Sequence, residues 1–294
     1  MDQLHVASAQ MQVETRSWSE SDGWSQPLPE NLDSESTLVL AFATPEREVA
    51  AGPVSELSRA FPLAKVIGCA TAGEIHGTRL RTGSVVAGIV RFAQTKVRNT
   101  SEVVGTREDS FDAGARIARS LAAPDLRAVF VLADGLKING AALVRGLHAT
   151  LPEGTVISGG MSGDGEDFKQ TWVLVDRSPM PGAVTAVGLY GDRIRVGYGS
   201  KGGWDVFGPE RLVTKAVGSV LYELDHKPAL PLYKKYLGEL SKDLPASALL
   251  FPLELRRSRE DPNCFVRSVM SIDEETQSMT FAGDVPEGHL AQLM

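Results

Sequence analysis

The residues best suited to chemistry lie between positions 67 and 75, in the run Ile-Gly-Cys-Ala-Thr-Ala-Gly-Glu-Ile. Glycine permits positive φ and lets a ligand or another backbone come close. Because Gly68 and Gly73 bracket small residues, Cys69, Thr71 and the free backbone amides can face a ligand, and Glu74 is the one formal charge nearby. Two interpretations stay open: a ligand-facing strand end, or a tight turn packed beneath a helix.

Cys69 is the candidate nucleophile, with His76 or His148 as its base. Nucleophilic catalysis needs Ser or Cys beside a base that is itself oriented by an acid. The sequence contains no Gly-x-Ser-x-Gly elbow, and a small buried side chain is the favoured interpretation of Cys69. The sequence therefore predicts that the protein is not an enzyme.

The histidines do not suggest a metal centre of several ligands, because no two of them have ligand spacing on one element. They are His5, His76, His148, His226 and His289. A haem needs only one axial protein donor, so a single histidine ligand to haem stays open as an alternative.

Two glycine-rich loops resemble nucleotide-binding motifs without fulfilling them. Residues 197–202 have the spacing of a dinucleotide fingerprint, but 203–208 intervene before Pro209, so no helix opens within the loop. Residues 158–165 lack the Gly-Lys-Ser/Thr ending of a phosphate-binding loop. Neither loop is expected to bind a nucleotide.

Composition places the chain among ordinary globular proteins. Its 294 residues are 43% hydrophobic and 23% charged, with a net charge of -7, so we expect no nonspecific nucleic-acid binding. The sequence contains no 18-residue apolar run and no signal-peptide pattern. We therefore expect that the chain does not span a membrane and is not exported. With Cys69 and Cys264 far apart in the sequence, a reduced cytoplasmic setting is expected.

Hydrophobic periodicity predicts alternating strands and helices in the first two hundred residues, after a loosely held polar arm over 1–34 that contains two tryptophans. Pro53 is expected to begin a helix, Asp109 or Ser110 to cap a second helix that buries Phe111, and Asn139 to cap a third. The predicted strands are 37–43, a strand running into the stretch at 67, a pair over 84–92 and 96–104 joined by a short turn, 127–133 and 155–158. The fold class predicted is α/β, with two domains and mixed β-sheets flanked by helices in a sandwich-like arrangement.

The last hundred residues show a change of period. Strand-like runs occupy 171–196, after which apolar residues at three- and four-residue steps between 209 and 224 predict an amphipathic helix. A second helix is predicted over 228–240, and strands near 248–251, 265–270 and 279–282. The two helices can form a dimer face as readily as a ligand wall.

The run 67–75 resembles the signature of the FIST N domain, and 156–164 is similar to a Gly-Gly segment late in that domain. The segments 203–208, 213–214, 223–230, 251–253, 266–268 and 283–288 resemble the FIST C domain. After the polar arm over 1–34, the resemblance implies a FIST N-like domain over 35–200 and a FIST C-like domain over 201–294. The latter is expected to be incomplete, because the sequence ends where that domain would continue.

The family resemblance implies a cytoplasmic sensory module that binds a small molecule, with amino acids among the proposed ligands, and acts on a signalling partner. Members similar in layout bind haem, sense nitric oxide and act on a histidine kinase. Two departures bear on the ligand: His226 stands where the family usually has glycine, and Asp205-Val206-Phe207 replaces a basic-Pro-hydrophobic run.

The ligand-binding residues predicted with this resemblance come from both domains. The first contributes Gly68, Cys69, Thr71, Gly73 and Glu74, and the second contributes Trp204, Thr214, Tyr233 and Arg267. Arg267 is predicted to clamp a carboxylate, and Glu74 to take an ammonium group. For the haem alternative, the order of preference for the axial ligand is His226, then His76.

Overall fold

A computed structural model describes residues 11–199 and 202–294, and it divides into two compact units. The first comprises Met1–Ile138 with Leu143–Tyr198, and the second Asn139–Ala142 with Gly199–Met294. No helix in the described part of the chain is long and apolar enough to cross a bilayer.

The first unit contains a mixed seven-stranded sheet of order β12-β11-β4-β3-β7-β1-β2. Its parallel pair is β3 with β4, and the other neighbours run antiparallel. The bounds of its strands are β1 Gln12–Ser19, β2 Gly23–Trp24, β3 Thr37–Ala43, β4 Lys65–Ala70, β7 Ser84–Arg91, β11 Val173–Val175 and β12 Ser178–Met180.

A four-stranded sheet of order β10-β9-β13-β8 completes the first unit, together with the small hairpin β5–β6. In this sheet β9 and β10 are parallel, so both end at the same edge. The bounds are β5 Glu74–His76, β6 Arg79–Arg81, β8 Lys96–Val103, β9 Leu126–Ala133, β10 Val156–Met161 and β13 Ala183–Tyr190.

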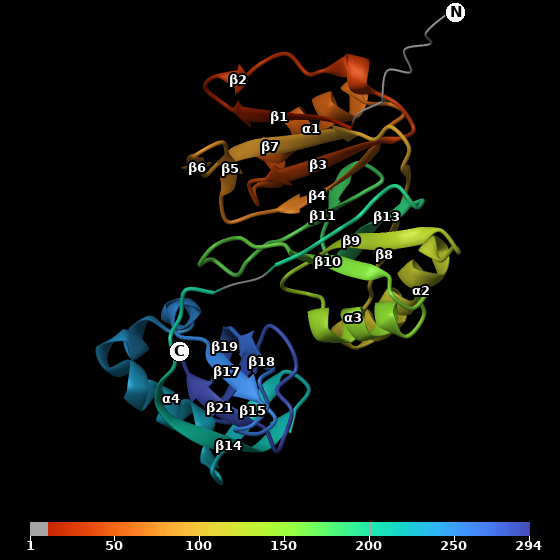
Figure 1. Ribbon diagram of the computed structural model, residues 1–294. Coiled ribbons are helices and arrows are strands. Elements are labelled where there is room, and N and C mark those ends of the chain that lie inside the picture. The colour runs from red at the N-terminus through yellow and green to blue at the C-terminus, as the bar shows by residue number, and fades with distance from the viewer. Residues whose placement is uncertain (1–10, 200–201) are drawn as a thin grey trace, which may run out of the picture. The chain divides into compact units, whose positions relative to one another are not determined.

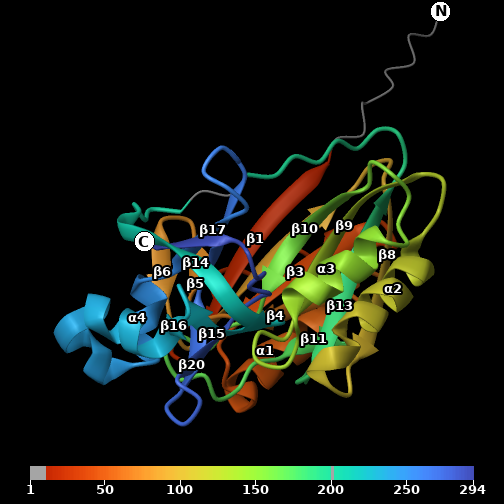
Figure 2. The same ribbon diagram turned by 90° about the horizontal axis from the view of Figure 1, so that it is seen from below.

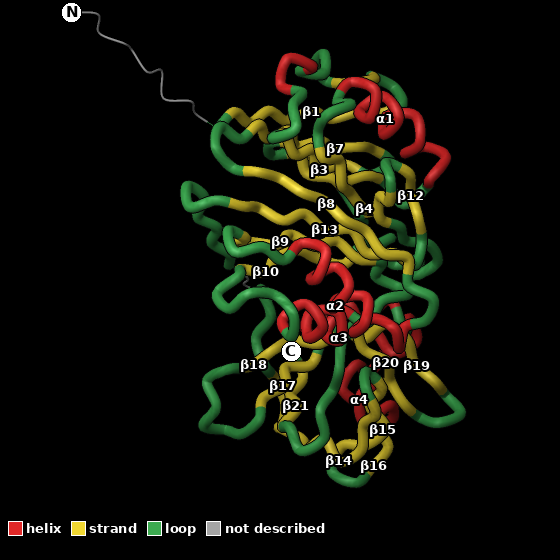
Figure 3. The backbone as a smooth tube through the Cα atoms, turned by 90° about the vertical axis from the view of Figure 1, so that its right-hand side faces the viewer, coloured by secondary structure: helices red, strands yellow, loops and turns green. Residues whose placement is uncertain are grey.

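Helices cover the outer faces of the two sheets, which produces four layers (Figures 1 and 3). Helix α1 (Arg47–Ala60) packs on the seven-stranded sheet, and α2 (Ser110–Leu121) and α3 (Gly140–His148) pack together on the four-stranded sheet (Figure 2). A third core, which includes Ile67, Cys69 and Leu132, fills the space between the sheets. The predicted sandwich-like α/β class is confirmed.

The second unit is an antiparallel sheet of order β18-β17-β21-β14-β15-β20-β19, with β16 pairing to β15. Helix α4 (Ala229–Leu237) buries Leu230 and Tyr233 in its core. Short 3-10 helices occupy Glu30–Leu32 and Arg107–Asp109 in the first unit, and Gly238–Asp243 and Ala246–Leu250 in the second. The strand bounds are β14 Phe207–Val217, β15 Val220–Leu224, β16 Lys227–Pro228, β17 Leu253–Arg256, β18 Cys264–Arg267, β19 Val269–Asp273, β20 Ser278–Phe281 and β21 Leu290–Leu293.

The predicted helix over 209–224 is wrong: β14 and β15 occupy these residues. Val213 is buried, but Leu212 and Val217 are exposed, so the apolar residues do not share one buried face. Gly218 has a φ of +56° and forms with Ser219 a two-residue turn between paired β-branched residues. That turn chemistry was the missed hairpin signal. The dimer face proposed for this helix therefore does not exist as a helical surface.

Three other expectations need correction in the first unit. The arm over 1–34 is not loosely held at 12–19, because β1 pairs along its whole length with β7, whereas residues 1–10 lie outside the described part. Pro53 lies inside α1 and is buried there, since core packing outweighs its missing N–H. The strands over 84–92 and 96–104 do not pair, because the chain passes from one sheet to the other between them.

The remaining corrections are local. Phe111 is 41% exposed rather than buried in α2. Of the strand predicted near 248–251, residues 248–250 lie in a 3-10 helix instead, and the next strand, β17, begins at Leu253. Residues 191–196 follow β13 without strand pairing. The helix predicted over 228–240 is confirmed as α4 with a 3-10 extension, as is the Asn139 cap, whose side-chain oxygen accepts the Ala142 N–H at 3.1 Å.

Candidate functional site

Three strand ends of the first unit meet at one place, which we call the strand-end cluster: residues 71–73 after β4, 134–135 after β9, 162–164 after β10, and Thr171. The Gly163 N–H donates to the Ala70 carbonyl at 3.1 Å. The Gly135 N–H donates to Ser162 Oγ, also at 3.1 Å. These contacts join the two sheets at the carboxyl ends of β4, β9 and β10. They also bring together the segments 67–75 and 156–164, which lie about ninety residues apart.

Asp134 organises the cluster from inside. Its side chain is 1% exposed, and Oδ1 accepts the N–H groups of Leu136 and Lys137 at 2.9 and 3.0 Å. The Thr171 hydroxyl also donates to Oδ1, at 2.6 Å, and the Gly182 N–H donates to Oδ2 at 2.7 Å. Four donors converge on one buried carboxylate, so Asp134 holds three separate loops in place.

Glu74 has a similar internal role. It is 2% exposed, and the hydroxyls of Thr71 and Ser84 donate to its two carboxylate oxygens at 2.6 Å each. The Ser84 N–H adds a longer bond of 3.3 Å. Both carboxylate oxygens are therefore engaged within the fold, and the contact of Glu74 with a ligand ammonium group stays a prediction.

Gly68 and Cys69 lie within the sheet rather than at its surface. A Cβ on Gly68 would come within 2.2 Å of the Ala41 carbonyl oxygen on the neighbouring strand, so glycine allows β3 and β4 to pack. Cys69 is 3% exposed in the core between the sheets. Gly73 is half-buried and would place a Cβ 2.9 Å from a Leu80 methyl group.

Burial raises the pKa of the Cys69 thiol to about 12. At pH 8 only about one molecule in ten thousand would carry the reactive thiolate. We therefore predict that a chromogenic disulfide reagent modifies only the exposed Cys264 in the folded protein and both thiols in denaturant. In a Cys264→Ser variant, rapid labelling of the folded protein would contradict this assignment.

The predicted residues of the second unit do not gather into one site. Trp204 is 43% exposed, and Thr214 Oγ1 accepts the His226 N–H at 2.9 Å. Arg267 donates from Nε to the Asp284 carbonyl at 2.9 Å and from Nη1 to the Val266 carbonyl at 3.1 Å. Its guanidinium lies over the Phe265 ring at 4.4 Å, and burial lowers its pKa. The carboxylate clamp stays a prediction.

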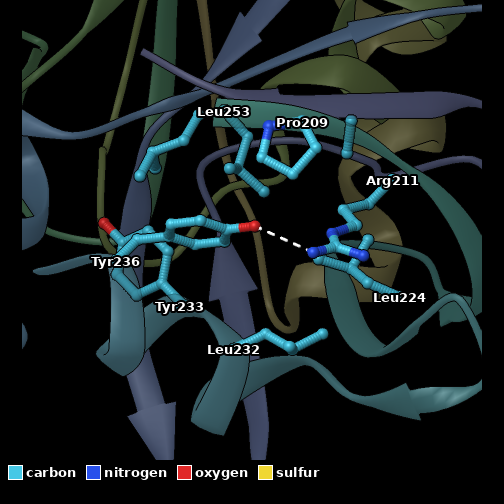
Figure 4. A pocket seen from close by; sticks show the side chains of 9 residues that line it. Pro209, Arg211, Leu224, Leu232, Tyr233, Tyr236 and Leu253 are labelled. Carbon is cyan, nitrogen blue, oxygen red and sulfur yellow. Dashed lines mark hydrogen bonds between the residues drawn. The ribbon is translucent and has the colours of Figure 1, made fainter. Parts of the chain in front are cut away.

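Tyr233 lines a small pocket in the second unit (Figure 4). The Tyr233 hydroxyl donates to the Phe251 carbonyl at 2.8 Å, and burial raises its pKa. Arg211 lies beside the pocket and donates to the Tyr236 hydroxyl at 3.0 Å and to Asp225 Oδ2 at 2.9 Å. The other lining residues are Pro209, Leu224, Leu232, Leu253, Ala291 and Leu293.

The space open to the centre of a water molecule in this pocket is about 20 Å³, so it accommodates a single water rather than an amino acid. Sequence reasoning did not single out Arg211, Asp225 or Tyr236 as site residues, and it assigned Arg211 to a helix that does not form. The recognisable signal was the Asp-His turn after a strand-like run, which predicts a hairpin at Asp225.

The two histidines proposed for haem belong to different units. Asp225 and His226, with φ of +51° and +60°, form the two-residue turn between β15 and β16, and His226 is exposed there. His76 Nε2 is within 3.2 Å of the Thr15 hydroxyl. An axial ligand needs an apolar pocket around the macrocycle, and neither an exposed turn nor a histidine bonded to a threonine fits that requirement.

The turn between β15 and β16 favours glycine over histidine at position 226. Both central residues of such a type I′ turn need positive φ, which costs a non-glycine residue about 1 kcal/mol. We predict that His226→Gly raises the free energy of unfolding of the second unit by about 1 kcal/mol, measured by urea denaturation. Lys227→Gly, at the adjacent paired strand position, should instead lower it. If both variants changed the free energy of unfolding in the same direction, the turn assignment would be contradicted.

Comparison with known proteins gives two matches to family models. The FIST N domain matches residues 37–227, and the FIST C domain matches residues 229–294. A search of curated proteins found no match. The FIST N match extends through β14 and β15 and therefore continues past Tyr198, where the first compact unit ends. The predicted domain boundary at 200/201 lies outside the described residues. Because the FIST N model alone covers more than half of the sequence, the chain belongs to the FIST family, whose domains are small-ligand sensory domains in signal transduction.

Proposed function

We propose that this protein binds a small polar molecule, an amino acid in the first instance, at the strand-end cluster and acts without catalysis on a partner such as a histidine kinase. The observation that carries the proposal is the Gly163–Ala70 hydrogen bond, through which the two FIST N motifs meet at the ends of β4 and β10. Ligands of open α/β sheets bind outside the carboxyl ends of parallel strands.

The cluster has the composition that such a site needs. Ala72 is exposed, and Gly73, Gly163 and Asp164 are half-buried, so small residues leave the backbone open to approach. Asp164 Oδ2 accepts the N–H groups of Lys169 and Gln170 at 2.6 and 2.8 Å, which orders the loop after β10. Buried Asp134 and Glu74 hold the surrounding loops, so the site would be largely preformed.

The non-catalytic part of the proposal rests on Cys69. A nucleophile must reach its substrate as a thiolate, and this thiol is buried with a raised pKa. The signalling part rests on membership of the family.

The experiment is a thermal-shift screen against the twenty amino acids, followed by calorimetry on each ligand that raises the melting temperature. A ligand at a hundredfold excess over Kd should stabilise the protein by about 2.7 kcal/mol, or roughly 5 °C. Gly163→Leu should weaken binding at least tenfold, because a Cβ there meets open space and the longer side chain would occupy the site without disturbing the fold.

Gly52→Leu is the matched control, because Gly52 is an exposed glycine of α1 whose Cβ also meets nothing within 4 Å. It should bind like the unsubstituted protein. The proposal fails if no amino acid raises the melting temperature, or if Gly163→Leu binds the ligand unchanged.

A further inference from the structure

The opposite end of β10 borders a separate cavity of about 520 Å³ in the first unit. This volume lies within the range of small-molecule sites, roughly 300–1,000 Å³. Its walls come from the last residue of α3, the loop that leads to β10, the first residues of β10 and Tyr198. It shares no residue with the strand-end cluster, although Tyr198 belongs to the glycine-rich run 197–202 and Ile157 to the segment 156–164.

The lining combines apolar contact area with few polar groups. Leu151, Pro152 and Ile157 supply aliphatic surface, and Leu151 is 9% exposed. Tyr198 is 77% exposed, so most of its surface is available for contact. A ligand with an aromatic or aliphatic body would bury this surface.

The electrostatics of the cavity favour a positive charge. His148, the last residue of the nine-residue helix α3, lines it, and the carboxyl end of a helix carries partial negative charge on its final carbonyls. Glu153 adds a formal negative charge to the lining. The face of a tyrosine ring also attracts cations. Arg145, in the last turn of α3, is not among the lining residues.

We propose that this cavity is a second ligand site, which binds a small organic cation with an aromatic body, such as an arylalkylamine. The ammonium group lies near Glu153 and the end of α3, and the aromatic body packs against Tyr198, Leu151 and Pro152. The site does not depend on amino-acid binding at the strand-end cluster.

The test compares two probes of similar shape and opposite charge, phenethylamine and phenylacetate, by calorimetry on the full chain. Phenethylamine should bind and phenylacetate should not. Tyr198→Ala should weaken phenethylamine binding about tenfold, and Tyr198→Phe should retain it because the ring face remains. Glu153→Gln should weaken binding about fivefold, since a charge-assisted interaction is lost.

Glu166→Gln removes an exposed carboxylate that does not line the cavity and should leave the affinity unchanged. Gly163→Leu should also bind phenethylamine normally, which separates this proposal from the site at the strand-end cluster. The second site is refuted if phenethylamine does not bind, if phenylacetate binds equally well, or if Tyr198→Ala leaves the affinity unaltered.

Discussion

Replacing Gly159 with alanine is expected to lower the free energy of unfolding of the first unit by about 4 kcal/mol, which combines steric overlap in a packed core with backbone strain. Gly159 pairs with Val131 on β9, and a Cβ would lie only 1.8 Å from the Val131 carbonyl oxygen. Its φ of +148° is one that residues with a side chain rarely adopt. Backbone atoms cannot move aside without breaking the sheet, so urea denaturation should show a much lower midpoint.

Gly160→Ala is the matched control in the next position of the same motif. A Cβ on Gly160 meets nothing within 4 Å, so this variant should change the free energy of unfolding by about 0.5 kcal/mol or less. If both variants lost the same free energy of unfolding, stability would not depend on the close approach of β10 to β9 at Gly159.

Removing the carboxylate of Asp134 is the second change expected to be severe. Asp134→Ala should lower the free energy of unfolding of the first unit by about 4 kcal/mol, because three backbone N–H groups and the Thr171 hydroxyl lose a buried acceptor. The four donors lie at 2.6 to 3.0 Å from the two carboxylate oxygens. Circular dichroism during urea denaturation measures the loss.

Asp134→Asn makes the same prediction sharper. An amide oxygen at the position of Oδ1 can keep three of the donors, whereas the amide nitrogen cannot accept the Gly182 N–H. The expected loss is therefore about 2 kcal/mol, between those of the unsubstituted protein and the alanine variant. Asp167→Ala, which removes an exposed carboxylate paired with Lys169, should have almost no effect. A loss for Asp134→Ala no larger than this control would contradict the structural role of Asp134.

Much of the first unit could be predicted because its signals are local. The apolar runs at 37–43 and 127–133 are too short for helices of typical length, and the structure has them as β3 and β9. Asn139 caps α3 through a bond to a residue three positions away, which is a contact that a short window contains. The family resemblance rests on motifs of the same local kind, and the family models confirm it.

Prediction failed where the same local pattern allows two structures. Apolar residues at 212, 213, 216 and 217 suit a helix face, and they also suit the two faces of a strand at the edge of a core. Only pairing of β14 with β15 and β21 decides between these outcomes, and β21 lies about seventy residues further along the chain. Likewise, β7 and β8 follow each other in the sequence but lie in different sheets, because β7 pairs with β3 and β8 pairs with β13. These pairings cannot be read from the sequences of β7 and β8 alone.

For the residues at 67–75, the amino-acid sequence by itself determined a glycine-rich strand end and membership of the FIST family. Tertiary structure alone decided what each residue does there. Gly68 makes room for Ala41 of the neighbouring strand, and Glu74 bonds to Ser84 across the β5–β6 hairpin. Whether a small or charged residue faces a ligand or a neighbouring strand depends on the segments that pack against it. Those segments are brought close only by folding, because burial and hydrogen bonding join residues that are distant in the chain.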